Sequence, residues 1–128
     1  MNLWYENLIK PPLTPPNQYF PIAWGIIYTL MGIAFLIILQ KRNDQTKYLA
    51  MNFYLIQLVL NFLWTYIFFD LKSINLALID IVLLLIFLIP TIIYFFKLSK
   101  FAGWLLIPYL LQVIFAIYLN IGLLILNP

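Results

Sequence analysis

Long uncharged runs alternate with short charged segments along this chain. No residue is charged from 19 to 39, from 48 to 69 or from 101 to 128, and a further run from 73 to 96 is interrupted only by Asp80. A helix of about 20 apolar residues spans the hydrocarbon core of a bilayer. The pattern predicts an all-α transmembrane helix bundle. Its four spans are expected at about residues 19–39, 48–69, 74–96 and 102–125.

The first 18 residues do not continue this pattern. They contain two proline pairs, which disfavour a regular helix, and charged residues where a signal peptide would have an apolar stretch. We therefore expect residues 1–18 to be a Pro-rich segment outside the membrane and residues 19–128 to form the bundle.

Composition strengthens the membrane assignment and narrows the chemistry. The chain is 66% hydrophobic and 9% charged, with a mean hydropathy of +1.03, whereas soluble domains carry roughly 25% charged residues. It contains no Cys and no His, which excludes disulfides, thiolate or imidazole metal sites, and Ser-His or Cys-His catalysis. We expect no metal, no cofactor and no catalytic residue.

The net charge of +3 is unevenly distributed along the chain. Five basic residues occupy the loops 41–47 and 97–100, while the opposite side carries only Lys10 and Lys72. Positive charge between apolar runs indicates membrane topology rather than nucleic-acid binding. By the positive-inside rule the five-charge side is cytoplasmic, and both termini are predicted to lie outside.

Three spans each carry a stripe of aromatic, amide or small residues at helical spacing. These stripes are Trp24, Tyr28 and Gly32; Gln57, Asn61, Trp64 and Phe68; and Gln112, Ala116 and Asn120. One interpretation is helix–helix packing through amides and small residues. The other is a shared cavity for a flat, largely apolar ligand with polar edges. Spacing alone does not separate the two.

Asp80 is the one acidic residue well inside a predicted span, about seven residues from its start. A functional interpretation makes it a proton or cation site. The interpretation we favour is a buried acid that accepts hydrogen bonds from nearby backbone, Tyr or Trp donors, because no second intramembrane carboxylate is present to pair with it.

The order of residues along the whole chain resembles the TspO/MBR family, the tryptophan-rich sensory proteins and translocator proteins or peripheral benzodiazepine receptors. The resemblance begins with Trp4-Tyr5, Lys10-Pro11, Pro15-Pro16, Trp24 and Tyr28. It continues with Gln57-Leu58, Asn61, Trp64, Ala77, Asp80, Pro108-Tyr109-Leu110, Ala116 and Leu119-Asn120. It implies a helical bundle that binds porphyrins and benzodiazepine- or isoquinoline-type ligands, and cholesterol in mitochondrial members.

The resemblance also implies a pocket, with the Pro-rich segment as its lid. Its lining residues, carried over by position, are Tyr5, Pro15, Trp24, Tyr28, Asn61, Trp64, Ile81 and Ala116, together with Gln112, which stands where the family has a Trp. That Trp is implicated in light-dependent porphyrin breakdown, so Gln112 disfavours an enzymatic role.

Further departures concern the span number and the cholesterol motif. Members of the family have five spans, and the first precedes the Trp-Tyr motif; a four-span variant, a truncated start and a partner subunit are the alternatives. Leu13 replaces the Trp between the proline pairs. No basic residue follows Tyr118, so no cholesterol site of the Tyr–Lys/Arg type is expected.

The leading hypothesis is a TspO-type membrane protein that senses or handles porphyrin-like molecules. Its expected partners are a tetrapyrrole or similar small molecule, membrane lipid and, as a homodimer, a second copy. The alternative is a small proton-coupled multidrug exporter, which requires a membrane-embedded carboxylate, and Asp80 is its candidate.

Overall fold

The computed structural model describes residues 8–10 and 19–127, and every regular element within them is helical. Helix α2 covers Tyr19–Leu39, α3 covers Gln45–Thr65, and the π-helix η1 extends α3 over Tyr66–Asp70. Helix α4 covers Ile74–Leu98, and the last part of the chain forms α5, Lys100–Leu105, and α6, Ile107–Leu126.

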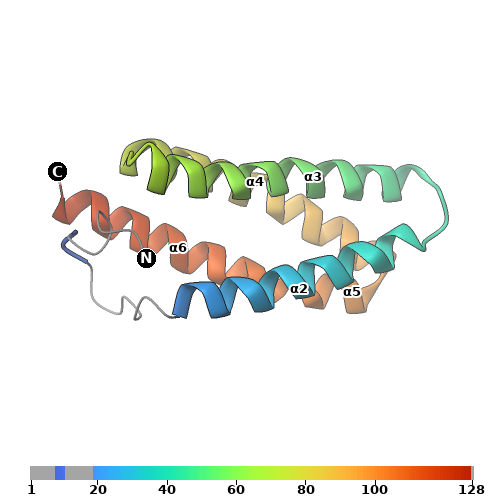
Figure 1. Cartoon of the computed structure of the whole chain (residues 1–128). Helices are drawn as coiled ribbons and strands as arrows, with labels where there is room; N and C mark the ends of the chain where they lie inside the picture. The colour runs from blue at the N-terminus through green and yellow to red at the C-terminus, as the bar shows by residue number, and fades with distance from the viewer. Residues whose placement is uncertain (1–7, 11–18, 128) are drawn as a thin grey trace.

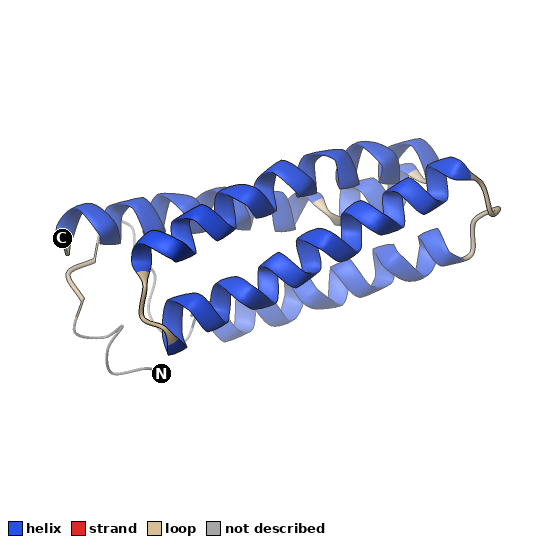
Figure 2. Ribbon diagram, turned by 90° about the horizontal axis from the view of Figure 1, so that it is seen from above, coloured by secondary structure: helices blue, strands red, loops and turns tan. Residues whose placement is uncertain are grey.

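Four helical segments in the described residues are long and apolar enough to cross a membrane. They are Ile22–Leu39, Gln45–Asp70, Ile74–Leu98 and Lys100–Leu126. The expected all-α bundle with four spans is confirmed. Figure 1 shows these segments as long helices that run roughly along one axis, and Figure 2 shows the same arrangement from above.

Short polar side chains determine where three of the helices begin. The side chain of Asp44 accepts a hydrogen bond from Lys47 N, and Ser73 Oγ and Ser99 Oγ accept from the backbone N–H groups of Leu76 and Ala102. Each bond satisfies an N–H group that has no partner inside the helix, which is the reason Ser and Asp favour the N-cap position.

A proline divides the fourth span into two helices. Pro108 lacks an N–H group, and its ring would collide with the carbonyl of Trp104 in a continuous α-helix. The chain tightens at Leu106 instead, whose N–H donates to Gly103 O at 3.1 Å. Helix α6 then begins at Ile107, so Pro108 occupies its first turn, where the missing N–H costs least.

Helix α4 is central to the packing. It contacts α3, α5 and α6, and the α3–α4 pair is the most extensive. Helix α2 packs mainly against α5 and makes only slight contact with α3 and α6. Figure 1 shows α2 and α3 farthest apart at the end where the chain termini lie. Fully buried alanines, among them Ala34, Ala50 and Ala102, allow close helix contacts elsewhere.

The two ends of the bundle are fixed by different polar contacts. At the basic end, the Lys47 ammonium donates to the carbonyls of Leu39 and Lys41 and to Asn43 Oδ1 at 2.8–3.1 Å. At the other end, Asn127 Oδ1 accepts from Ile9 N at 3.0 Å while Asn127 Nδ2 donates to Ile9 O at 2.7 Å. Which end faces the cytoplasm stays a prediction from charge.

Candidate ligand-binding site

A cavity of about 740 Å³ lies between α2, α3, η1, α4 and α6. Its volume falls in the range of small-molecule sites, roughly 300–1,000 Å³. Most of its lining side chains are aromatic or aliphatic, with a small number of amides and hydroxyls. The lining residues are Trp24, Tyr28, Asn61, Phe62, Trp64, Thr65, Tyr66, Phe68, Phe69, Asp70, Ile81, Leu84, Gln112, Val113, Ala116, Leu119, Asn120 and Leu123.

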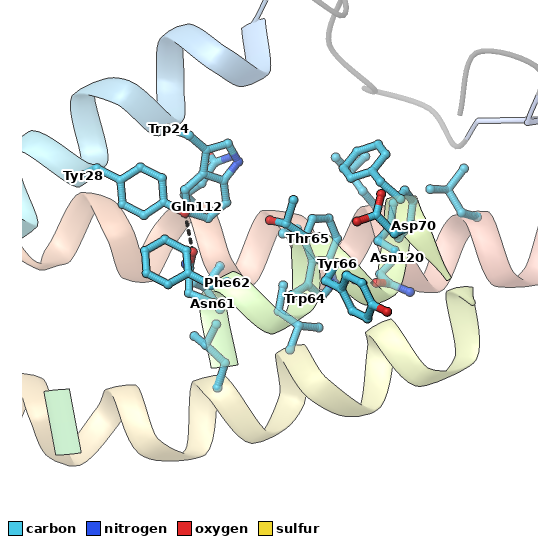
Figure 3. A pocket seen from close by; sticks show the side chains of 18 residues that line it. Trp24, Tyr28, Asn61, Phe62, Trp64, Thr65, Tyr66, Asp70, Gln112 and Asn120 are labelled. Carbon is cyan, nitrogen blue, oxygen red and sulfur yellow. Dashed lines mark hydrogen bonds between the residues drawn. The ribbon is translucent and has the colours of Figure 1, made fainter. Parts of the chain in front are cut away.

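One end of the cavity, which we call the inner end, is formed by Trp24 and Tyr28 of α2, Asn61 of α3 and Gln112 of α6 (Figure 3). The rings of Trp24 and Tyr28 lie 5.7 Å apart between centroids. The Tyr28 hydroxyl donates a hydrogen bond to Asn61 Oδ1, which joins α2 to α3 across the space where their backbones stand apart.

The hydrogen bond between Tyr28 and Asn61 is the first of a series that extends into the core. Asn61 Nδ2 donates to the Tyr109 hydroxyl at 3.0 Å, and that hydroxyl donates to Gln57 Oε1 at 2.5 Å. Gln57 Nε2 in turn donates to Tyr54 O at 2.7 Å. The network links three helices and leaves the second amide proton of Asn61 as a donor. Buried polar groups of this kind are stable in lipid because each has a partner.

The other end, which we call the outer end, is formed by η1 and the neighbouring residues of α3 and α6. The rings of Trp64 and Phe68 stack at 4.9 Å, and Phe69 packs edge-on against Phe68 at 4.9 Å. Trp64 Nε1 donates to Asn120 Oδ1 at 3.0 Å, and Asn120 Nδ2 donates to Ile74 O at 3.0 Å. This second network joins α3, α6 and the start of α4.

Seven of the nine residues predicted to line a pocket are brought together around this cavity. They are Trp24, Tyr28, Asn61, Trp64, Ile81, Gln112 and Ala116. Tyr5 and Pro15 lie outside the described residues, as does most of the segment expected to form the lid. That the seven bind a ligand stays a prediction. The third member of the first stripe, Gly32, is exposed and faces open space rather than the cavity.

Several lining residues were not singled out from the sequence. Tyr66 and Asp70 belong to the π-helix, in which backbone hydrogen bonds run five residues back, as Leu71 N does to Tyr66 O at 3.1 Å. The wider turn changes which side chains share a face. No sequence pattern signals such a turn, and in the sequence Asp70 is only the first charged residue after the uncharged run 48–69.

Asp80 lies next to Ile81 on α4 but does not line the cavity. It is 5% exposed, and its Oδ2 forms no hydrogen bond with any described residue. The expectation that this carboxyl accepts hydrogen bonds from nearby donors is therefore wrong for Oδ2. The reason is local: the N–H groups of α4 are used within the helix, and Ala77 and Leu84, buried on the same side, are apolar.

Fold and cavity together define a class: an α-helical membrane protein with a ligand-sized, aromatic-lined cavity inside its bundle. Within residues 8–10 and 19–127, no group of three or more acidic side chains could hold a metal ion. The family model described as the TspO/MBR family matches residues 1–126. The chain belongs to this family.

Its relatives include bacterial, archaeal and mammalian proteins. It is 41% identical to the tryptophan-rich protein TspO of Chlorobaculum tepidum, an alignment that covers 98% of this chain and 80% of the relative. It is 38% identical to the tryptophan-rich sensory protein of Cereibacter sphaeroides, over 91% of this chain and 72% of that protein. It is 31% identical to the human translocator protein, over 91% and 70% of the two chains.

Proposed function

We propose that this protein binds porphyrin-like tetrapyrroles and other flat, largely apolar molecules in the cavity, and senses or handles them without changing them chemically. The observation that carries the proposal is the lining itself: indole and phenol rings at both ends, with amides from α3 and α6 between aliphatic walls. Ring faces stack on flat ligands, and the amides satisfy a small number of polar edge groups.

Family membership supports the same proposal, since relatives carry the names tryptophan-rich sensory protein and translocator protein. The positions of Gln112 and Trp24 at the inner end favour binding over turnover, because an amide at position 112 supplies no second indole for photochemistry beside Trp24. We also propose that the protein is a homodimer in the membrane.

The structure gives little support to the exporter alternative. A proton-coupled exporter requires a carboxylate that a proton and a cationic substrate occupy in turn. Asp80, the carboxylate inside a span, does not line the cavity, and Asp70, which does line it, is exposed at the end of η1 rather than embedded within a span.

The proposal is tested by titrating protoporphyrin IX into the purified protein in lipid nanodiscs while tryptophan fluorescence is recorded. Trp24 and Trp64 line the cavity, and Trp104, 65% exposed, lies outside it. We expect saturable quenching that survives in Trp104→Phe. Ala116 lines the cavity, so the larger side chain in Ala116→Phe should occupy part of the space that the ligand needs and abolish saturable quenching.

The matched control is Ile125→Phe, which also places a phenylalanine on α6, at a site that is 69% exposed and outside the cavity. It should bind like the unmodified protein. Quenching that never saturates, or that saturates equally in Ala116→Phe and Ile125→Phe when both are folded by circular dichroism, would refute binding in this cavity.

A further inference from the structure

The described residues that line the cavity carry one negative charge and no positive charge. Among the described lining residues Asp70 is the single charged side chain, and no basic side chain lines the cavity. Asp70 is exposed, and none of the residues 8–10 and 19–127 forms an ion pair with it. The field of a carboxylate at this position extends into the cavity that it lines.

Several aromatic residues line the same end of the cavity as this carboxylate. Tyr66, Phe68 and Phe69 belong to the same π-helix as Asp70 and line the same end of the cavity, and Trp64 stacks on Phe68. Figure 3 shows Asp70 and Tyr66 together at the end opposite Trp24 and Tyr28. Faces of Trp, Tyr and Phe attract cations, and aromatic residues with a carboxylate are a recurring site for organic ammonium groups.

The inner end has the opposite character. Trp24 Nε1 forms no hydrogen bond with the described residues, so its N–H is available to a ligand acceptor. The amide of Asn61 adds a second donor, because only one of its two protons is committed, to Tyr109. The cavity therefore offers donors at the inner end and a negative charge among ring faces at the outer end.

From this asymmetry we infer that the cavity selects ligands with a flat apolar body, a hydrogen-bond acceptor at one edge and a positively charged group at the other, held by Asp70 and the rings of η1. The inference rests on the proposed function and deepens it by naming the ligand class. Ligands that carry carboxylates at the outer end are disfavoured, because their charge would meet that of Asp70.

The test uses three porphyrins with the same ring and different edges: protoporphyrin IX, which has two carboxylates, its neutral dimethyl ester, and a diamide that ends in two ammonium groups. Their dissociation constants are measured in zwitterionic nanodiscs, so that bilayer charge does not sort them. We expect the diamide to bind more tightly than the ester, and the ester more tightly than the diacid.

The decisive variant is Asp70→Asn, which keeps the shape of the side chain and removes its charge. We expect it to lower the preference for the diamide over the ester about three- to tenfold, the size of a partly exposed cation–carboxylate and cation–π contact. Affinity for the ester should stay within about twofold. Asp44→Asn is the matched control, since Asp44 is exposed at the opposite end of α3 and Asn retains N-cap ability. It should leave all three affinities unchanged.

The possible outcomes distinguish failure of this inference from failure of the proposed function. Saturable binding with a diamide-to-ester ratio that is the same in Asp70→Asn and the unmodified protein overturns this inference and leaves the proposed function intact. A ratio that falls equally in Asp44→Asn also overturns it, because net charge would then explain the effect. Absence of saturable binding for all three porphyrins refutes the proposed function and the inference with it.

Discussion

Removal of one hydroxyl group from the core should destabilise the whole bundle. Tyr109 is fully buried, and its hydroxyl accepts a hydrogen bond from Asn61 and donates one to Gln57. Tyr109→Phe keeps the ring and deletes both bonds. The amides of Asn61 and Gln57 then each lose a partner, and the phenylalanine ring, which occupies the volume of the tyrosine ring, offers no polar group in its place.

The expected loss follows from those two bonds. Interhelical hydrogen bonds in membrane proteins contribute on average about 0.6 kcal/mol and at most about 1.7 kcal/mol each. Two of them give a loss of about 1–3.5 kcal/mol in the free energy of unfolding. The upper part of that range applies if both amides stay unsatisfied, since a buried polar group without a partner costs about 1–3 kcal/mol.

The measurement is reversible unfolding in mixed micelles with increasing sodium dodecyl sulfate, followed by far-ultraviolet circular dichroism. Tyr48→Phe is the matched control, because Tyr48 is 51% exposed at the basic end of α3 and its hydroxyl has no partner among the described residues. The reasoning is refuted if Tyr109→Phe unfolds within about 0.5 kcal/mol of Tyr48→Phe, because the network would then contribute nothing to stability.

Two further substitutions test the packing of the bundle at its basic end. A Cβ at Gly103 would lie 2.5 Å from Cγ of Phe96, so Gly103→Ala should cost about 1–3 kcal/mol in the same unfolding assay, whereas Gly32→Ala, which meets nothing within 4 Å, should be neutral or stabilising. Lys47→Met removes an ammonium group that binds three acceptors near the end of α2 and should cost about 1.5–3 kcal/mol, but Lys41→Met, an equal change in charge, should cost less than about 1 kcal/mol. Equal effects within either pair would contradict the assigned contacts.

Hydrophobic patterning predicted the helices of this fold well because, in a membrane, each long uncharged run corresponds to one helix. An uncharged run long enough to cross lipid must satisfy its own backbone, and a helix is the only single-segment way to do so. Polar periodicity then placed Asn61, Gln112 and Asn120 on inward faces, and all three are buried. An amide inside a membrane span is costly to expose to lipid, so it turns toward the interior of the bundle.

The same periodicity was wrong where a helix has few neighbours. Residues four apart on an α-helix drift by about 40° per step, so Trp24 and Tyr28 reach the cavity while Gly32 has turned away from it. The buried positions of α2 are instead Ile27, Met31, Ala34 and Ile38, on a helix that packs mainly against α5. Which side of a helix is buried depends on the helices that pack against it, and the sequence of α2 alone does not show which helices those are.

The outer end was missed for a different reason. A π turn and an unpaired carboxylate at the end of a span look in the sequence like an ordinary loop boundary, because Asp70 and Lys72 follow the last apolar residue as charges also do after the first and third spans. Only the three-dimensional course of η1 shows that Asp70 shares the cavity with Tyr66 and Phe68.

The two hydrogen-bond networks explain why a cavity exists between helices that could otherwise close on one another. Tyr28 is held to Asn61 at the inner end, and Trp64 is held to Asn120 at the outer end. Collapse of the cavity would break these bonds, and buried polar groups that lose their partners cost several kcal/mol for the set. The space is therefore preformed, and a ligand that enters it meets oriented donors at one end and Asp70 at the other. Because the walls need not rearrange, discrimination between ligands falls on their edge groups rather than on their ability to open the bundle.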